Sequence, residues 1–206
     1  MLNSCLMNFK FGFVLIILFS TTLLSEGQNF DIDMLNKINS TSSLPSDKSW
    51  NFVSNTVTPI CFATPIAMLV TGLSTHNKEL QIKSIESGAA ILLANAFSYS
   101  IKIAVKRQRP FTTYPDLITK KGHENTFSFP SGHTTAAFAT ATSLSMAFPK
   151  WYVIVPSYTY ASAVAYSRMH LGMHYPSDVL AGIIIGVGTS LLTFQTDKWL
   201  NKKYNK

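Results

Sequence analysis

Three short stretches of the sequence carry residue types that could do chemistry together. They are Lys102-x6-Arg109-Pro110, Pro130-Ser131-Gly132-His133 and Ser167-Arg168-x5-His174-x3-Asp178. Together they supply three cations, two imidazoles, a carboxylate and a glycine-containing turn. Cations and backbone amides stabilise a phosphoryl group, and an imidazole can accept one. The set therefore predicts that a phosphoryl group is held and transferred to histidine.

The first stretch places cations at one end of an apolar segment. Lys102, Lys106 and Arg109 are spaced i, i+4 and i+7, so on a helix they would share one face. Pro110 restricts the residue before it, and we expect the helix to end at Arg109. Taken alone, the stretch is at least as typical of a basic helix end that faces solvent or lipid headgroups.

The second stretch has the composition of an anion-binding helix start. Pro130-Ser131-Gly132-His133 precedes a segment rich in Ala and Thr. Gly132 lets the backbone approach a ligand closely, and free amides at a helix N-terminus favour an anion. Ser131 can add a hydroxyl donor, and His133 would then stand beside the bound anion. Ser-Gly-His is also a common helix start, so alone it is a weak signal.

The third stretch pairs a histidine with a carboxylate. Asp178 follows His174 by four residues, close enough to accept the imidazole N–H. Such a carboxylate fixes the tautomer of the imidazole and makes its other nitrogen a better nucleophile. A hydrogen-bonded structural histidine and a metal site that includes His170 are the alternatives. Gly172 and Pro176 argue against the continuous helix that the spacing of that metal site would need.

With this order and spacing the chain resembles the type 2 phosphatidic acid phosphatase superfamily. That group includes membrane lipid phosphatases, class A acid phosphatases and vanadium haloperoxidases, and all three stretches match its motifs. The resemblance implies that the phosphoryl oxygens are bound by Lys102, Arg109, Ser131, Gly132 and Arg168. It also implies that His174 attacks phosphorus to form a phosphohistidine, with Asp178 orienting it. His133 would protonate the leaving oxygen and later activate water.

The resemblance further implies an enzyme that needs no metal and no cofactor. One histidine must be neutral to attack and the other protonated to donate, so we expect activity to be bell-shaped in pH. His123 and His170 fall outside the three stretches. We expect them to be loop residues that could line the site.

The bulk composition points to a membrane or to an unusually apolar helical domain. Apolar residues make up 47% of the 206 residues and charged residues only 13%, about half the usual share for a soluble protein. The net charge of +7 can indicate an anionic substrate, an anionic lipid surface or nucleic acid. No stripe of Lys and Arg on a polar surface is visible, which argues against nucleic acid.

Five apolar stretches, each close to a membrane span in length, must position these residues: 57–73, 88–105, 133–148, 151–166 and 179–194. No alternating strand pattern occurs, so we expect an all-α fold, a transmembrane bundle of five to six helices. Gly182, Gly186 and Gly188 would permit close helix approach. If all five stretches span, the three motifs meet at one membrane face.

The N-terminus resembles an export signal, with Lys10 before the apolar residues 11–24. We expect residues 1–27 to be a signal peptide or an uncleaved anchor and 28–56 a polar periplasmic linker, with a short amphipathic helix near 32–38. Residues 57–206 would form the catalytic domain. Cys5 lies in the leader and Cys61 stands alone after it, which leaves no intramolecular disulfide in the mature chain.

The leading hypothesis is an integral membrane phosphatase of a lipid phosphate monoester or diphosphate. Candidates are phosphatidic acid, phosphatidylglycerol phosphate, undecaprenyl diphosphate and lipid A phosphate. Lysines in the tail favour a cytoplasmic C-terminus and an active site at the periplasmic face of a bacterial inner membrane, although cations also lie on the proposed outer side. The alternatives are a soluble periplasmic acid phosphatase of broad specificity and a non-catalytic membrane protein that binds an anion or lipid headgroup. A haloperoxidase is disfavoured because those enzymes are generally larger.

Overall fold

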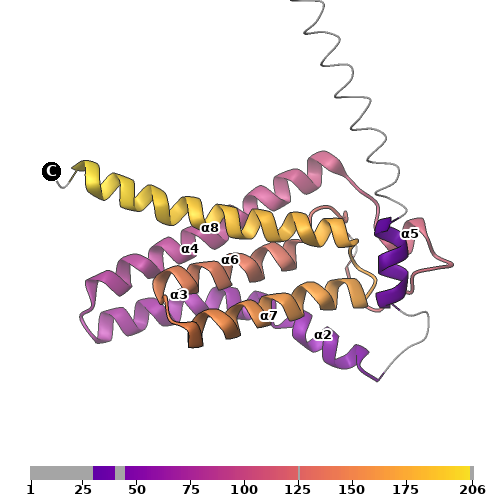
Figure 1. The fold of residues 1–206 in the computed structure, drawn as a ribbon, viewed down its shortest axis with the longest axis horizontal. Coiled ribbons are helices and arrows are strands. Elements are labelled where there is room, and N and C mark those ends of the chain that lie inside the picture. Colours follow the sequence, from indigo (N-terminus) through magenta and orange to yellow (C-terminus); the bar gives the residue numbers. More distant parts are fainter. Residues whose placement is uncertain (1–29, 40–44, 125, 205–206) are drawn as a thin grey trace, which may run out of the picture.

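Five long helices run side by side along the long axis of the molecule (Figure 1). The computed structural model describes residues 30–39, 45–124 and 126–204. The long helices are α3 (Val57–Ser74), α4 (Lys78–Val105), α6 (Gly132–Ala147), α7 (Trp151–His170) and α8 (Pro176–Tyr204). Each contains all or nearly all of one of the five apolar stretches, and the described residues contain no strand. The predicted all-α bundle is confirmed.

Shorter helices complete the described chain. α2 (Asp47–Asn55) leads into α3 and packs against α7, and α5 (Pro110–Thr113) is a single turn. Residues 30–39 form a helix close to α5, across one end of the bundle (Figure 1). The predicted signal peptide or anchor, residues 1–27, lies outside the described residues, and the division into leader, linker and catalytic domain stays a prediction.

Helix α6 lies at the centre of the bundle, in contact with α3, α4, α7 and α8. Most of its residues are buried, although many are Thr or Ser. Most of their hydroxyls donate to backbone carbonyl oxygens of the same helix, as Thr140 Oγ1 does to Ala136 O (2.9 Å) and Thr142 Oγ1 to Phe138 O (2.8 Å). Because the hydroxyls are satisfied locally, a small-residue helix can be surrounded by others without leaving buried polar groups unpaired.

Two glycines allow α8 to lie directly against α6. A Cβ at Gly182 would come within 2.8 Å of the Ser131 carbonyl oxygen, and one at Gly186 within 2.5 Å of the Thr135 carbonyl oxygen. A Cβ at Gly188 would meet nothing within 4 Å. Of the three glycines predicted to permit close approach, Gly182 and Gly186 do so, and Gly188 does not.

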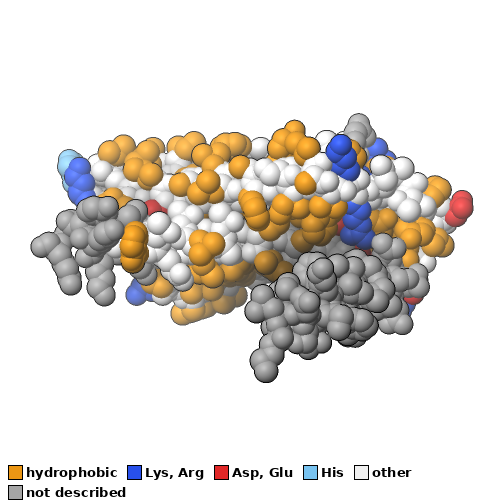
Figure 2. All heavy atoms as spheres, turned by 90° about the horizontal axis from the view of Figure 1, so that it is seen from above, with side chains coloured by type: hydrophobic (Ala, Val, Ile, Leu, Met, Phe, Trp, Pro, Cys, Tyr) orange, Lys and Arg blue, Asp and Glu red, His pale blue; other side chains and the backbone are white. Residues whose placement is uncertain are grey.

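Large apolar side chains cover the outside of the bundle. Phe62, Leu92 and Ile184 are 60%, 63% and 63% exposed. Figure 2 shows hydrophobic side chains along the length of one face, with few charged ones over its middle. Within the part of the chain that the structure describes, three helical segments are long and apolar enough to cross a membrane: Asp47–Ser74, Lys78–Thr113 and Pro176–Thr196. Such a surface suits lipid rather than water, so the predicted class, a transmembrane helical bundle, is confirmed.

Candidate active site

The three stretches meet at one end of the bundle. α4 and α7 end there, and α6 and α8 begin there (Figure 1). Backbone contacts join them: the Ser131 amide donates to the Asp178 carbonyl oxygen at 3.1 Å. The turns between α3 and α4 and between α6 and α7 lie at the opposite end. The antiparallel order of the helices is therefore what brings residues far apart in sequence to one place.

The chain turns sharply after α4, so the predicted end of this helix at Arg109 is wrong. α4 stops at Val105, and Lys106 adopts the left-handed backbone conformation with a φ of 51°. Lys106 is exposed and does not share a helix face with Lys102 and Arg109. Arg109 is instead an extended residue before α5, in which Pro110 takes the first helical position. A turn, rather than the helical repeat, directs Arg109 into the site.

Lys102 holds the loop that leads into α6. Its Nζ donates hydrogen bonds to the carbonyl oxygens of Phe127 (2.7 Å), Ser128 (3.3 Å) and Pro130 (2.9 Å). An ammonium group has three donors, so all three point at this loop. Lys102 thereby fixes the approach of the Pro130-Ser131-Gly132-His133 stretch to the site.

Arg109 is buried and lies directly beside His174. Its Nε donates to the Thr126 carbonyl oxygen (2.5 Å) and its Nη1 to the Met173 carbonyl oxygen (2.8 Å). Nη1 lies 3.4 Å from His174 Nε2. The two carbonyl contacts orient the guanidinium plane, so that its edge faces the imidazole.

Arg168 is the cation with unused donors. Its side chain is only 4% exposed, and its Nη1 donates to Ser54 Oγ on α2. Its Nε and Nη2 are buried without a hydrogen-bond partner among the described residues. A buried donor without an acceptor is costly, and a phosphoryl oxygen is an acceptor that would satisfy both groups.

The start of α6 faces the same space. Ser131 is the buried residue that precedes the helix, and its hydroxyl bonds to Thr134 Oγ1 at 2.9 Å. A Cβ at Gly132 would meet nothing within 4 Å, so the backbone there is open to a ligand. His133 follows in the first turn with its side chain 26% exposed. The first amides of α6 and the His133 ring are thus placed beside an open volume.

His174 lies in the loop between α7 and α8, and Asp178 lies in the first turn of α8. Nδ1 of His174 is 3.5 Å from Oδ2 of Asp178, which leaves Nε2 on the side of Arg109. Burial lowers the pKa of His174 to about 3, more strongly than the neighbouring Asp178 raises it. The imidazole is therefore neutral near pH 7, the form that can attack phosphorus.

The structure adds a carboxylate that the sequence reasoning missed. Glu124 lies among three predicted site residues: Oε1 is 3.4 Å from Arg168 Nη2 and 3.6 Å from His133 Nδ1, and Oε2 is 3.4 Å from Arg109 Nη2. Nothing in the polar loop 111–129 singles it out by type or spacing. Glu124 holds the position of a counter-anion between the two guanidinium groups.

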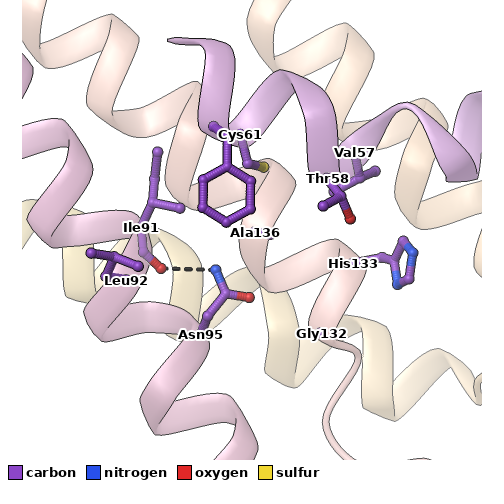
Figure 3. A pocket seen from close by; sticks show the side chains of 10 residues that line it. Val57, Thr58, Cys61, Ile91, Leu92, Asn95, Gly132, His133 and Ala136 are labelled. Atoms are coloured by element: carbon purple, nitrogen blue, oxygen red, sulfur yellow. Dashed lines mark hydrogen bonds between the residues drawn. The ribbon is translucent and has the colours of Figure 1, made fainter. Parts of the chain in front are cut away.

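A cavity of about 310 Å³ opens between α3, α4 and α6, next to this centre. In Figure 3 His133 lies at one side of the cavity, and Ile91 and Leu92 lie at the other. Its lining is mainly apolar, and the Asn95 amide turns back onto the Ile91 carbonyl oxygen (2.8 Å). The cavity therefore offers an apolar space that is bordered by His133.

Two of the three histidines outside the motifs, His123 and His170, differ in their surroundings. His170 is the last residue of α7 rather than a loop residue, and its Nε2 lies 2.7 Å from Asp47 Oδ1, where it anchors α2. His123 is an exposed loop residue. The described residues contain no group of three or more His, Cys, Asp or Glu arranged to hold a metal ion. His170 thus contacts α2 and not the pair formed by His174 and Asp178.

Fold and site together define a membrane-embedded helical bundle with two histidines and a cluster of cations at one end. The sequence matches the PAP2 superfamily over residues 84–202, more than half of the chain. The protein belongs to the PAP2 superfamily, as the resemblance predicted.

Similar proteins include phosphatases of lipid-linked groups. A decaprenylphosphoryl-5-phosphoribose phosphatase of Mycolicibacterium smegmatis is 38% identical over 97 residues, 46% of this chain and 49% of the relative. An undecaprenyl-diphosphatase of Sulfolobus acidocaldarius is 32% identical over 96 residues, 47% of this chain and 46% of the relative. The chain spans about half the length of these curated relatives. The crystal structure of Aquifex aeolicus LpxE can be superposed on 81% of this chain, and the matched part is 95% of the LpxE chain. The TM-score is 0.70 and the sequence identity 23%, so the two proteins share the fold.

Proposed function

We propose that the protein hydrolyses a lipid phosphate monoester or diphosphate through a phosphohistidine intermediate. The observation that carries the proposal is the convergence of His174, His133 and the Arg168 donors that lack a hydrogen bond within the described chain, grouped around Glu124 at one end of the bundle. Phosphoryl transfer requires mainly positioning and charge stabilisation, and this centre can supply both.

The proposed reaction has two steps. His174 Nε2 forms a bond to phosphorus while the bond from phosphorus to the leaving oxygen breaks. His133 donates its proton to that oxygen, and then accepts a proton from the water that attacks the phosphohistidine. The second step releases inorganic phosphate and restores both imidazoles. Asp178 faces Nδ1 of His174 and orients the ring for the attack.

The phosphoryl oxygens are proposed to bind Arg168, Arg109, Ser131 and the Gly132 amide, with Lys102 holding the loop before α6. Arg168 supports this assignment most directly, because its Nε and Nη2 are buried without hydrogen bonds within the described chain. Glu124 is 3.4 Å from both Arg168 and Arg109, so an incoming phosphoryl group would take over contacts that this carboxylate now makes.

A lipid leaving group is supported by two features of the molecule. The mainly apolar cavity between α3, α4 and α6 reaches His133, the residue proposed to protonate the leaving oxygen. The surrounding helices present apolar side chains outward, so a substrate could enter from the bilayer. The names of the relatives, with decaprenyl and undecaprenyl carriers, point to the same class.

The test is phosphate release by the detergent-purified protein from phosphatidic acid and from undecaprenyl diphosphate. We expect turnover of at least one lipid, and a loss of about 10³-fold or more in His174→Ala, since removal of a nucleophile leaves only binding and charge stabilisation. His76→Ala, an exposed histidine at the opposite end of the bundle, is the matched control.

Full activity in His174→Ala would contradict the phosphohistidine mechanism. Recovery of the protein in the soluble fraction without detergent would favour the broad-specificity acid phosphatase instead. Lipid binding with no turnover of either substrate would favour a non-catalytic headgroup-binding protein. Vanadate-dependent oxidation of halide would indicate a haloperoxidase.

A further inference from the structure

A largely buried ionic cluster, in which Asp31 and Arg107 have no motif role, connects the helix over 30–39 to Asp178. Arg107 lies between two carboxylates: its Nη1 is 2.7 Å from Asp178 Oδ1 and its Nη2 is 2.8 Å from Asp31 Oδ2. The two Asp side chains are 0% and 7% exposed, respectively. The guanidinium group also lies 3.8 Å from the centre of the Tyr175 ring. One residue thus bridges the helix over 30–39, the turn after α4 and the start of α8.

Asp178 is held on both of its oxygens. Oδ1 accepts from Arg107, while Oδ2 accepts from Ser128 Oγ and from the Tyr175 amide at 2.9 Å. The same Oδ2 faces His174 Nδ1. Because a rotation of the carboxylate would break these contacts, Arg107 on Oδ1 acts with Ser128 and the Tyr175 amide on Oδ2 to fix which oxygen faces the imidazole.

Asp31 holds the other side of the cluster. Its Oδ1 accepts from the Ser177 amide (2.8 Å), and its Oδ2 accepts from the Ser177 hydroxyl and from Arg107. Ser177 precedes Asp178, so Asp31 fixes both the first turn of α8 and the cation that holds its carboxylate. The helix over 30–39 also contacts the end of α7 through Asn39, whose Nδ2 donates to the His170 carbonyl oxygen at 2.8 Å.

Stability alone is a weak explanation for this cluster. Two carboxylates and a guanidinium group lose hydration when they are buried, and apolar side chains of similar volume often stabilise a fold equally well. Charged hydrogen bonds also fix the orientation of the groups that they join. Here the fixed group is the carboxylate next to the proposed nucleophile.

We propose that Asp31 and Arg107 are positioning residues for the phosphoryl transfer, acting on His174 through Asp178. The inference rests on the proposed function of His174 as the nucleophile. Neither residue contacts the donors assigned to the phosphoryl oxygens, so their loss slows the chemical step and leaves substrate binding in place.

The experiment compares Asp31→Asn and Arg107→Gln with the wild-type protein, with whichever of phosphatidic acid and undecaprenyl diphosphate the wild-type protein hydrolyses faster. We expect kcat per folded protein to fall about tenfold or more and KM to stay within about twofold, as for other residues that orient a reacting group. Asp33→Asn is the matched control, since Asp33 lies on the same helix and is exposed. It should leave both constants unchanged.

Two further variants separate positioning from folding. Arg107→Lys keeps the charge but lacks the fork that bridges two carboxylates, so it should recover kcat only in part. The double variant Asp31→Asn/Arg107→Gln should lose about as much kcat as Arg107→Gln alone, because the two residues act along one path. Gel filtration and melting temperature measure the amount of folded protein. If total activity falls only as much as the amount of folded protein, so that kcat per folded protein is unchanged, the role is structural and the inference is overturned.

The possible failures can be told apart. Wild-type turnover with an inactive His174→Ala, together with an unchanged kcat in Asp31→Asn and Arg107→Gln, overturns the inference alone. A rise in KM without a fall in kcat also overturns it. Full activity in His174→Ala contradicts the proposed function itself, whatever kcat is measured for Asp31→Asn.

Discussion

At the scale of single residues, the three motif cations are engaged to different degrees. Lys102 uses all three donors on the loop before α6, and Arg109 is anchored by three carbonyl oxygens. Arg168 alone among these three has buried donors without a hydrogen bond to the described chain. The family motif treats the three cations alike, whereas their contacts differ: Lys102 and Arg109 are hydrogen-bonded to the chain, and Arg168 keeps Nε and Nη2 without a hydrogen bond, although Nη2 lies 3.4 Å from Glu124.

The buried position of His174 leads to a prediction about pH and stability. Burial lowers its pKa to about 3, while in the unfolded chain it has its ordinary value near 6.5. Between these values the unfolded state binds the extra proton, so this contribution to stability is complete above about pH 6.5 and is lost as pH falls toward 3, by at most about 1.4 kcal/mol per pH unit. We expect His174→Gln to show a smaller fall in melting temperature from pH 7 to pH 5 than the wild-type protein.

The comparison needs a histidine that is not buried. His76→Gln changes an exposed histidine and should keep the wild-type dependence of the melting temperature on pH. An unchanged pH dependence in His174→Gln would mean that other groups dominate the acid destabilisation.

At the scale of secondary-structure elements, the apolar stretches predicted where helices form but not how they end. The five stretches carry the five long helices because burial and lipid exposure both favour apolar residues there. The end of α4 depends instead on the left-handed residue Lys106, and neither its type nor its neighbours require that conformation. The turn sends Arg107 toward Asp178 and Arg109 toward His174, an arrangement that helical spacing could not predict.

The contact between α6 and α8 predicts different effects for two nearby glycines. In Gly186→Ala the new methyl group would clash with the α6 backbone, so we expect a loss of about 1–3 kcal/mol in unfolding free energy. Turnover should fall as well, because Asp178 at the start of α8 is bonded to Ser131 at the start of α6.

Gly188→Ala is the matched control on the same helix. Its Cβ would meet open space, and alanine favours a helix over glycine by about 1 kcal/mol. We expect Gly188→Ala to be neutral or slightly more stable, with unchanged turnover. Thermal melting measures the stability of the two variants, and phosphate release in detergent measures their turnover. Equal effects of Gly186→Ala and Gly188→Ala would contradict the packing argument.

At the scale of the whole molecule, the sequence predicted that the motif residues meet at one end of the bundle, but it did not predict the residues that hold them there. His174, His133 and the three motif cations could be assigned because family motifs specify their type and order. Glu124, Asp31 and Arg107 belong to no motif, and their positions depend on loop conformations and on the docking of the helix over 30–39. Contacts across 76 residues, such as that of Arg107 with Asp31, leave no local pattern in a single sequence.

The proposed orientation of the bundle can be tested with cysteine reporters at its two ends. His123 is exposed at the end that carries the site, and Lys78 is exposed at the opposite end, where α4 begins. In a Cys5→Ser background with buried Cys61 retained, we expect His123→Cys to react with a membrane-impermeant maleimide on intact spheroplasts. Lys78→Cys should react only after lysis, because lysines of the tail favour a cytoplasmic side for that end. Phosphate release by both variants checks that they are folded, and the reverse labelling pattern would place the site at the cytoplasmic face.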